Sequence, residues 1–147
     1  MKLKIYLDNC CYSRPFDDFS IGKNGLEATA KMFIQSLVKY NSVLLCYSYM
    51  SLFEIDEIPF EENKQHIQNF VVNNADIYIS KTQNDKIENT ADEIMQTGIK
   101  QKDVTHLACA LLAECDYFIT TDKRVLKYKT PKMKIIDPIE FVKAWRA

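Results

Sequence analysis

The sequence predicts an α/β fold with a central, mostly parallel five-stranded sheet that helices cover on both faces. Short apolar runs rich in Ile, Val, Leu, Tyr and Phe alternate along the chain with segments of helical periodicity. The length of 147 residues is usual for one domain that buries its own core. With only 3 Gly and 4 Pro, the chain has no linker-like or Pro-rich stretch. We therefore expect a single domain over residues 1–147.

Five apolar runs have the composition and length of strands buried on both faces. They lie at residues 3–7, 43–48, 76–79, 116–120 and 134–136. Helical segments separate them, so parallel neighbours joined by helical crossovers are the expected arrangement.

Helical periodicity fills the segments between the strands. Apolar residues at steps of three and four predict four helix faces. The first face consists of Leu26, Ala30, Phe33, Leu37 and Tyr40, the second and weaker one of Phe60, Ile67, Phe70 and Val71, the third of Ile87, Ala91, Ile94 and Met95, and the fourth of Val104, Leu107, Ala108, Leu111 and Leu112.

Start and stop signals delimit two of the helices. Residues 80–83, Ser-Lys-Thr-Gln, have the spacing of a capping box, and Gly98 is a stop signal. Near the C-terminus, Asp137 precedes Pro138 and lies three residues before Glu140, which is the pattern of a helix N-cap. We therefore assign Asp137 a structural role.

Composition and charge exclude several classes of protein. No run approaches the roughly 20 apolar residues of a membrane-spanning helix, so we expect no membrane contact. The N-terminal segment is charged too early for a signal peptide. Five Cys, without a Cys-x-x-Cys pair, favour reduced thiols and a cytoplasmic location. The net charge is −1, but acids gather at residues 54–62 and bases at 123–134.

Four acidic residues lie near the ends of predicted strands. Asp8 directly follows the first strand, and Glu54 lies six residues after the second, early in a short helix. Asp103 opens a helix, and Asp122 lies two residues beyond the fourth strand. Ligands of parallel sheets bind outside the carboxyl ends of the strands, so the four acids are candidates for one site. Clustered carboxylates suit Mg²⁺ or Mn²⁺, which activate water and hold phosphate.

Each acid also has a purely structural interpretation, which is the commoner one for any single residue. Asp8 fits a turn, Asp103 and Asp122 fit helix caps, and Glu54 fits an exposed surface position among acidic neighbours. The ordered combination favours a shared metal site instead.

This combination resembles the PIN-domain ribonucleases, the fold of VapC-type toxins. The resemblance lies in KIYLDN at residues 4–9, SYMSLFE at 48–54, KDVTHLACA at 102–110 and CDYFITTDK at 115–123. It implies a three-layer α/β/α fold and RNA cleavage by metal-activated water. It also implies Mg²⁺ or Mn²⁺ as cofactor, an antitoxin protein as partner and a homodimer. The residues that it assigns to metal binding and catalysis are Asp8, Glu54, Asp103 and Asp122.

Further polar residues flank these acids. Asn9, where the family often has Thr or Ser, keeps a side-chain oxygen for a supporting role. Ser48 and Thr121 are candidates either for hydrogen bonds to the metal-binding carboxylates or for local capping of backbone amides. His106 is a candidate for contact with substrate phosphate or metal-bound water, and its alternative and commoner role is that of a satisfied, partly buried polar group.

Basic and aromatic residues near the acids are candidates for RNA binding. Lys123 and Arg124 immediately follow the fourth acid and can contact phosphates, unless they belong to a solvated loop. Arg14, with Tyr12 and Phe16, follows the first strand and can contact unpaired bases. Core packing or a structural ion pair is the alternative for these three residues.

The sequence therefore predicts a metal-dependent endoribonuclease. Its resemblance to VapC makes it a candidate for the toxin of a toxin–antitoxin pair. A housekeeping RNA-processing nuclease and a non-catalytic nucleic-acid-binding module are the alternatives. Retention of all four acids disfavours the binding module, because a negative cluster facing phosphate weakens binding.

Overall fold

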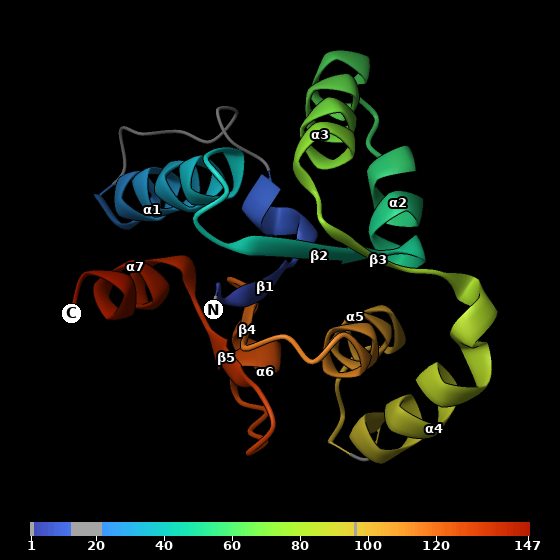
Figure 1. Ribbon diagram of the computed structural model, residues 1–147. Coiled ribbons are helices and arrows are strands. Elements are labelled where there is room, and N and C mark those ends of the chain that lie inside the picture. The colour runs from blue at the N-terminus through green and yellow to red at the C-terminus, as the bar shows by residue number, and fades with distance from the viewer. Residues whose placement is uncertain (1, 13–21, 96) are drawn as a thin grey trace.

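The protein has a parallel five-stranded sheet at its centre, with strand order β3-β2-β1-β4-β5 (Figure 1). A computed structural model describes residues 2–12, 22–95 and 97–147. All four neighbouring strand pairs are parallel. Each strand lies within a predicted range, so the predicted sheet is confirmed. The strands are β1 (Lys4–Leu7), β2 (Leu44–Ser48), β3 (Ile77–Ile79), β4 (Tyr117–Ile119) and β5 (Lys134–Ile136).

Helices cover both faces of this sheet. In Figure 1, α1, α3 and α7 lie on one side of the strands, and α4 and α5 lie on the other. Of the helices within the described residues, none is long and apolar enough to cross a bilayer. The elements are η1 (Asn9–Tyr12), α1 (Gly22–Lys39), α2 (Tyr49–Asp56), α3 (Glu61–Asn74), η2 (Lys81–Gln83), α4 (Asn84–Met95), α5 (Gln101–Leu112), α6 (Lys123–Leu126) and α7 (Pro138–Arg146).

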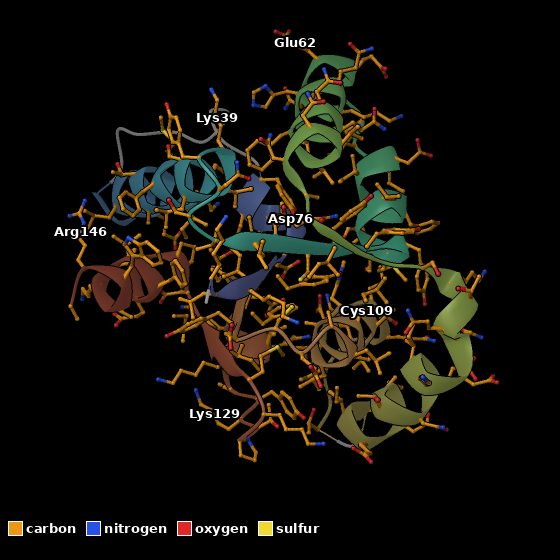
Figure 2. All side chains as sticks on the ribbon, in the orientation of Figure 1. Lys39, Glu62, Asp76, Cys109, Lys129 and Arg146 are labelled. Atoms are coloured by element: carbon orange, nitrogen blue, oxygen red, sulfur yellow. The ribbon has the colours of Figure 1, made fainter. Side chains whose placement is uncertain are left out.

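Alternate strand residues supply two cores, one on each face of the sheet. Ile5 and Leu7 of β1 pack with side chains of α1, α3 and α7. Tyr6, between them, packs on the opposite face with Phe118 and with side chains of α4 and α5. Figure 2 shows Cys109 inside this second layer, whereas Lys39 projects from the outside of the molecule. The result is a three-layer α/β/α arrangement.

The predicted apolar face of α1 is wrong at both ends. Leu26 is 64% exposed and Tyr40 is 75% exposed. Ile34 and Val38 are buried instead, one position along from the predicted stripe. Tyr40 lies beyond the end of the helix, where Asn41 takes a left-handed φ of 60°, so helical periodicity no longer determines which way its side chain faces.

The capping signals have mixed outcomes. The predicted capping box at residues 80–83 is wrong, because the Ser80 hydroxyl bonds the Thr82 hydroxyl and α4 begins at Asn84. Gly98, at φ +82°, follows the end of α4 as predicted. The N-cap of α7 is also confirmed, since Asp137 Oδ1 accepts a 2.8 Å hydrogen bond from a backbone amide in the first turn of the helix.

Candidate functional site

One buried hydroxyl joins two of the predicted acids at the carboxyl edge of the sheet. β1 pairs with β4 so that Leu7 lies opposite Ile119, and the residues that follow these two leave the sheet side by side. Thr120 Oγ1 donates a 2.7 Å hydrogen bond to Asp8 Oδ2 and accepts a 3.1 Å bond from the amide of Asp122. The Asp8 carboxylate is therefore fixed in orientation, next to the segment that carries Asp122.

Asp103 lies in the first turn of α5, where it faces the other acids. It is not the helix cap that its position suggested, because Lys100 occupies the N-cap position. Burial and the negative charges of Asp8, Asp122 and, to a smaller extent, Glu54 raise the pKa of Asp103 to about 6. Asp8, Glu54 and Asp122, far from Asp103 in the sequence, thus each lie within electrostatic reach of Asp103. The four acids are 46, 49 and 19 positions apart in turn (54−8, 103−54, 122−103).

Glu54 reaches the site from the last turn of α2 rather than from its start, which corrects the sequence expectation. Its carboxylate hydrogen-bonds Nε2 of His106. Burial acts to raise the pKa of Glu54, but the hydrogen bond and electrostatic attraction of His106, followed by the positive charge of Lys102, outweigh it and hold that pKa below its ordinary value. Glu54 therefore stays ionised at neutral pH.

His106 is fully buried and uses both ring nitrogens within the protein. Nδ1 lies 2.6 Å from the Tyr6 hydroxyl, which in turn contacts the hydroxyls of Ser48 at 2.7 Å and Ser51 at 3.0 Å. In either protonation state of the ring, Nε2 is the nitrogen that donates to the ionised Glu54 carboxylate. His106 is thus a satisfied buried group that orients Glu54, and it has no nitrogen left for substrate.

The two hydroxyls predicted to support the carboxylates make other contacts. Ser48 caps α2, because its hydroxyl accepts from the Ser51 amide at 3.4 Å and Ser51 reciprocates at 3.1 Å. Thr121 Oγ1 donates to Cys10 Sγ at 3.2 Å. The supporting hydroxyl is that of Thr120, a residue that the sequence interpretation missed.

Asn9 presents an unsatisfied oxygen beside Asp8. Its Nδ2 donates to the Ser51 carbonyl at 3.3 Å, but its Oδ1 is buried and has no hydrogen-bond partner among the described residues. A buried acceptor without a donor costs about 1–3 kcal/mol. This oxygen therefore marks a position where a cation or a water molecule would be stabilised.

The donor atoms at this edge fit a hard divalent cation. Within residues 2–12, 22–95 and 97–147, no three His, Cys, Asp or Glu side chains lie close enough together to enclose a metal ion. Mg²⁺ does not need such an enclosure, because it commonly binds through one or two carboxylates and keeps several waters. The carboxylate oxygens and Asn9 Oδ1 are all of the type that Mg²⁺ and Mn²⁺ prefer.

The predicted RNA-binding residues have different positions. Lys123 and Arg124 are exposed, and the Arg124 amide donates to Asp122 Oδ1 at 2.8 Å. Tyr12 is 2% exposed, so it belongs to the core and is not available to stack on a base. Arg14 and Phe16 lie outside the described residues.

Comparisons with known proteins identify the fold. No family model and no curated protein matches the sequence. VapBC2 from Rickettsia felis, solved bound to a DNA fragment from its promoter, matches with a TM-score of 0.57 at 14% identity, over 92% of this chain and 98% of that chain. FitAcB from Neisseria gonorrhoeae matches with a TM-score of 0.54 at 13% identity, over 91% and 97%. At these identities the likeness shows the fold alone, and that fold is the PIN-like α/β/α arrangement predicted from the sequence.

Proposed function

We propose that the protein is a Mg²⁺- or Mn²⁺-dependent endoribonuclease that hydrolyses RNA phosphodiester bonds. The observation that supports this proposal is that Asp8, Asp122 and Glu54 all act on Asp103 near one sheet edge and, together with its burial, raise the pKa of Asp103 to about 6. Gathering like charges costs stability. A divalent cation and an anionic substrate explain that cost.

The residues divide the work of such a site. One or two of the carboxylates of Asp8, Glu54, Asp103 and Asp122 would contact the cation directly, together with Asn9 Oδ1, and the others would act through its bound water. The cation, when bound, would lower the pKa of a water molecule and offset phosphate charge. Thr120 holds the Asp8 carboxylate in orientation, and His106 does the same for Glu54. Hydrolysis by a metal-activated water would need no covalent protein intermediate.

The same proposal extends to partners. The sequence resemblance to VapC-type toxins and the VapBC2 fold neighbour support an antitoxin protein as partner. A homodimer is implied by the sequence resemblance alone. A neighbouring reading frame for a small DNA-binding protein is the expected genetic context. Its absence would favour the housekeeping RNA-processing nuclease.

The test is RNA cleavage by the purified protein. We expect cleavage of pooled single-stranded RNA with Mg²⁺ or Mn²⁺ and none with EDTA. Asp8→Asn and Asp103→Asn should each reduce the rate about 100-fold, the equivalent of about 3 kcal/mol of transition-state stabilisation. Asp92→Asn, an exposed acid on α4, is the matched control and should cleave like the wild type. Cleavage by pure protein that survives EDTA would contradict the proposal.

A further inference from the structure

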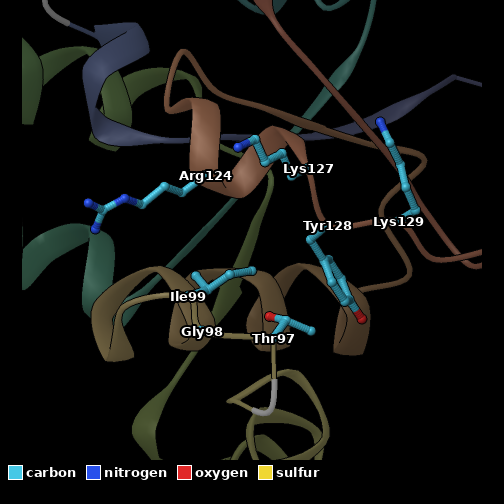
Figure 3. Close-up of a pocket in the computed structure, with 7 residues that line it drawn as sticks. All are labelled: Thr97, Gly98, Ile99, Arg124, Lys127, Tyr128 and Lys129. Atoms are coloured by element: carbon cyan, nitrogen blue, oxygen red, sulfur yellow. The ribbon is translucent and has the colours of Figure 1, made fainter.

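A basic pocket lies beside the proposed metal site without being part of it. Its volume is about 350 Å³. One wall is the turn after α4, residues 97–99, and the other is formed by Arg124, Lys127, Tyr128 and Lys129 of α6 and the segment that follows it (Figure 3). Two segments far apart in the sequence therefore enclose it.

The charge of this pocket is one-sided. Arg124, Lys127 and Lys129 line it, and no acid among the described residues does. None of these three cations forms an ion pair with a carboxylate in the part of the chain that the structure describes. Three cations along the rim, with no acid among the described lining residues, give the pocket a positive potential that favours a bound anion.

The pocket is tied to the site by a short, hydrogen-bonded segment. The Arg124 amide donates to Asp122 Oδ1 at 2.8 Å, and the Leu126 amide donates to the Asp122 carbonyl at 3.0 Å. The Tyr128 amide donates to the Val125 carbonyl at 3.0 Å, and Val125 is fully buried. These bonds fix the distance between the pocket and Asp122, the N-cap of α6. An RNA strand that is bound in the pocket therefore reaches Asp122 at a constant number of nucleotides.

The wall of the pocket offers both polar and aromatic recognition. Tyr128 is partly buried against the core, and Figure 3 shows its ring reaching toward Thr97. Arg124 and Lys127 extend to one side of this ring, and Lys129 extends to the other. A tyrosine face stacks on any base, and neighbouring cations bind the phosphate of the same nucleotide.

We propose that this pocket binds one nucleotide of single-stranded RNA at a position away from the cut bond. The phosphate lies on Arg124 and Lys127, and the base lies against Tyr128. That the ligand is part of an RNA strand rests on the proposed nuclease function. The evidence for the pocket itself is its charge and its shape, which do not depend on that function.

The experiment measures binding of fluorescent single-stranded RNA in EDTA, over a range of salt concentrations. Arg124→Ala with Lys127→Ala should lower the slope of log K against log salt by about 0.7, because the pocket neutralises one phosphate and each neutralised phosphate of a single strand adds about 0.7 to that slope. Lys132→Ala with Lys134→Ala is the matched control. It removes the same charge from exposed positions at the start of β5, on the amino edge of the sheet, and should leave the slope unchanged.

Two further measurements test how the nucleotide is bound. Tyr128→Leu should weaken binding by about 5-fold or more without changing the salt slope, because stacking of about 1–3 kcal/mol releases no counterions. Tyr128→Phe keeps the ring and should bind like the wild type. In the cleavage assay, Arg124→Ala with Lys127→Ala should raise KM and leave kcat within about twofold, as expected for an interaction that substrate and transition state share.

Failure of the pocket and failure of the nuclease assignment give different results. Equal slopes for the pocket and control variants would overturn the pocket. Competition by a ribonucleoside monophosphate as strong as that by the RNA would overturn an RNA strand as its ligand. Wild-type protein that binds RNA with the full slope but never cleaves it would overturn the nuclease assignment and support the pocket. Absence of any RNA binding would overturn both.

Discussion

The free-energy cost of gathering the acids falls mainly on the ionisation of Asp103. Its carboxyl ionises with a pKa of about 6 in the folded protein, against 3.8 for an ordinary Asp. Between these values the folded state binds more protons than the unfolded state, so the free energy of unfolding falls as pH rises from about 4 to about 6. The proposed cation, when bound, would restore this stability at neutral pH.

The first prediction follows from this fall in the free energy of unfolding as the pH rises. Without metal at pH 7, Asp103→Asn should be more stable than the wild type by about 1 kcal/mol, a value reduced for solvent screening of this half-exposed group. The melting temperature should rise by about 2–4 °C. The gain should vanish at pH 4, where the wild-type carboxyl is protonated. Asp92→Asn should show no such pH-dependent gain. A variant that melts lower than the wild type at pH 7 would show that Asp103 is not strained.

Single residues also show why the sequence could point to strand-end acids as candidates but not to the groups that hydrogen-bond them. Carboxylates at strand ends form a visible pattern in the sequence. Thr120 and Thr121 are adjacent and chemically identical, and the choice between them depends on the register that places Leu7 opposite Ile119, which no sequence pattern specifies. The contact between His106 and Tyr6 likewise joins positions 100 residues apart.

At the scale of elements, local sequence patterns predicted the features whose contacts lie within the element or with its neighbours in the sequence. Strand positions followed from short apolar runs, and Asp137 capped α7 as its Pro138 indicated. The buried face of α1 depends on its packing against η1 and α7, and this tertiary constraint shifts the stripe to Ile34 and Val38. The sequence pattern places Glu54 early in its helix, because it does not show that Ser48 caps α2 directly after β2.

Two helices with the same type of cap allow a matched prediction. Asp122 Oδ1 and Asp137 Oδ1 each accept a 2.8 Å hydrogen bond from a backbone amide in the first turn of a helix. Asn caps about as well as Asp, so Asp122→Asn and Asp137→Asn should both unfold within about 0.5 kcal/mol of the wild type. Only Asp122→Asn should lose RNA cleavage. Equal activity of the two variants would reduce Asp122 to a helix cap.

At the scale of the whole molecule, the sheet order is what creates the candidate site. β1 and β4 are neighbours, and β2 lies on the other side of β1, so the segments that carry Asp8, Asp122 and Glu54 all leave the same sheet edge. The α5 helix then brings Asp103 to that edge from the face that it covers. An unfolded chain cannot hold these four side chains together, because 114 positions separate the first from the last (122−8).

Metal binding should therefore be coupled to global stability. A ligand that binds the folded state alone stabilises it by RT ln(1 + [L]/Kd), about 2.7 kcal/mol when the ligand is at 100 times Kd. For a chain of this length, that gain corresponds to a rise in melting temperature of about 5–10 °C.

Millimolar Mn²⁺ should produce such a rise in the wild type. The double variant Asp8→Asn with Asp103→Asn should gain little. Arg124→Ala with Lys127→Ala should gain as much as the wild type, because the pocket and the metal site are separate. A wild-type protein whose melting temperature ignores Mn²⁺, measured by calorimetry against the same protein in EDTA, would mean that the acids converge without binding a cation, and the nuclease proposal would lose its physical basis.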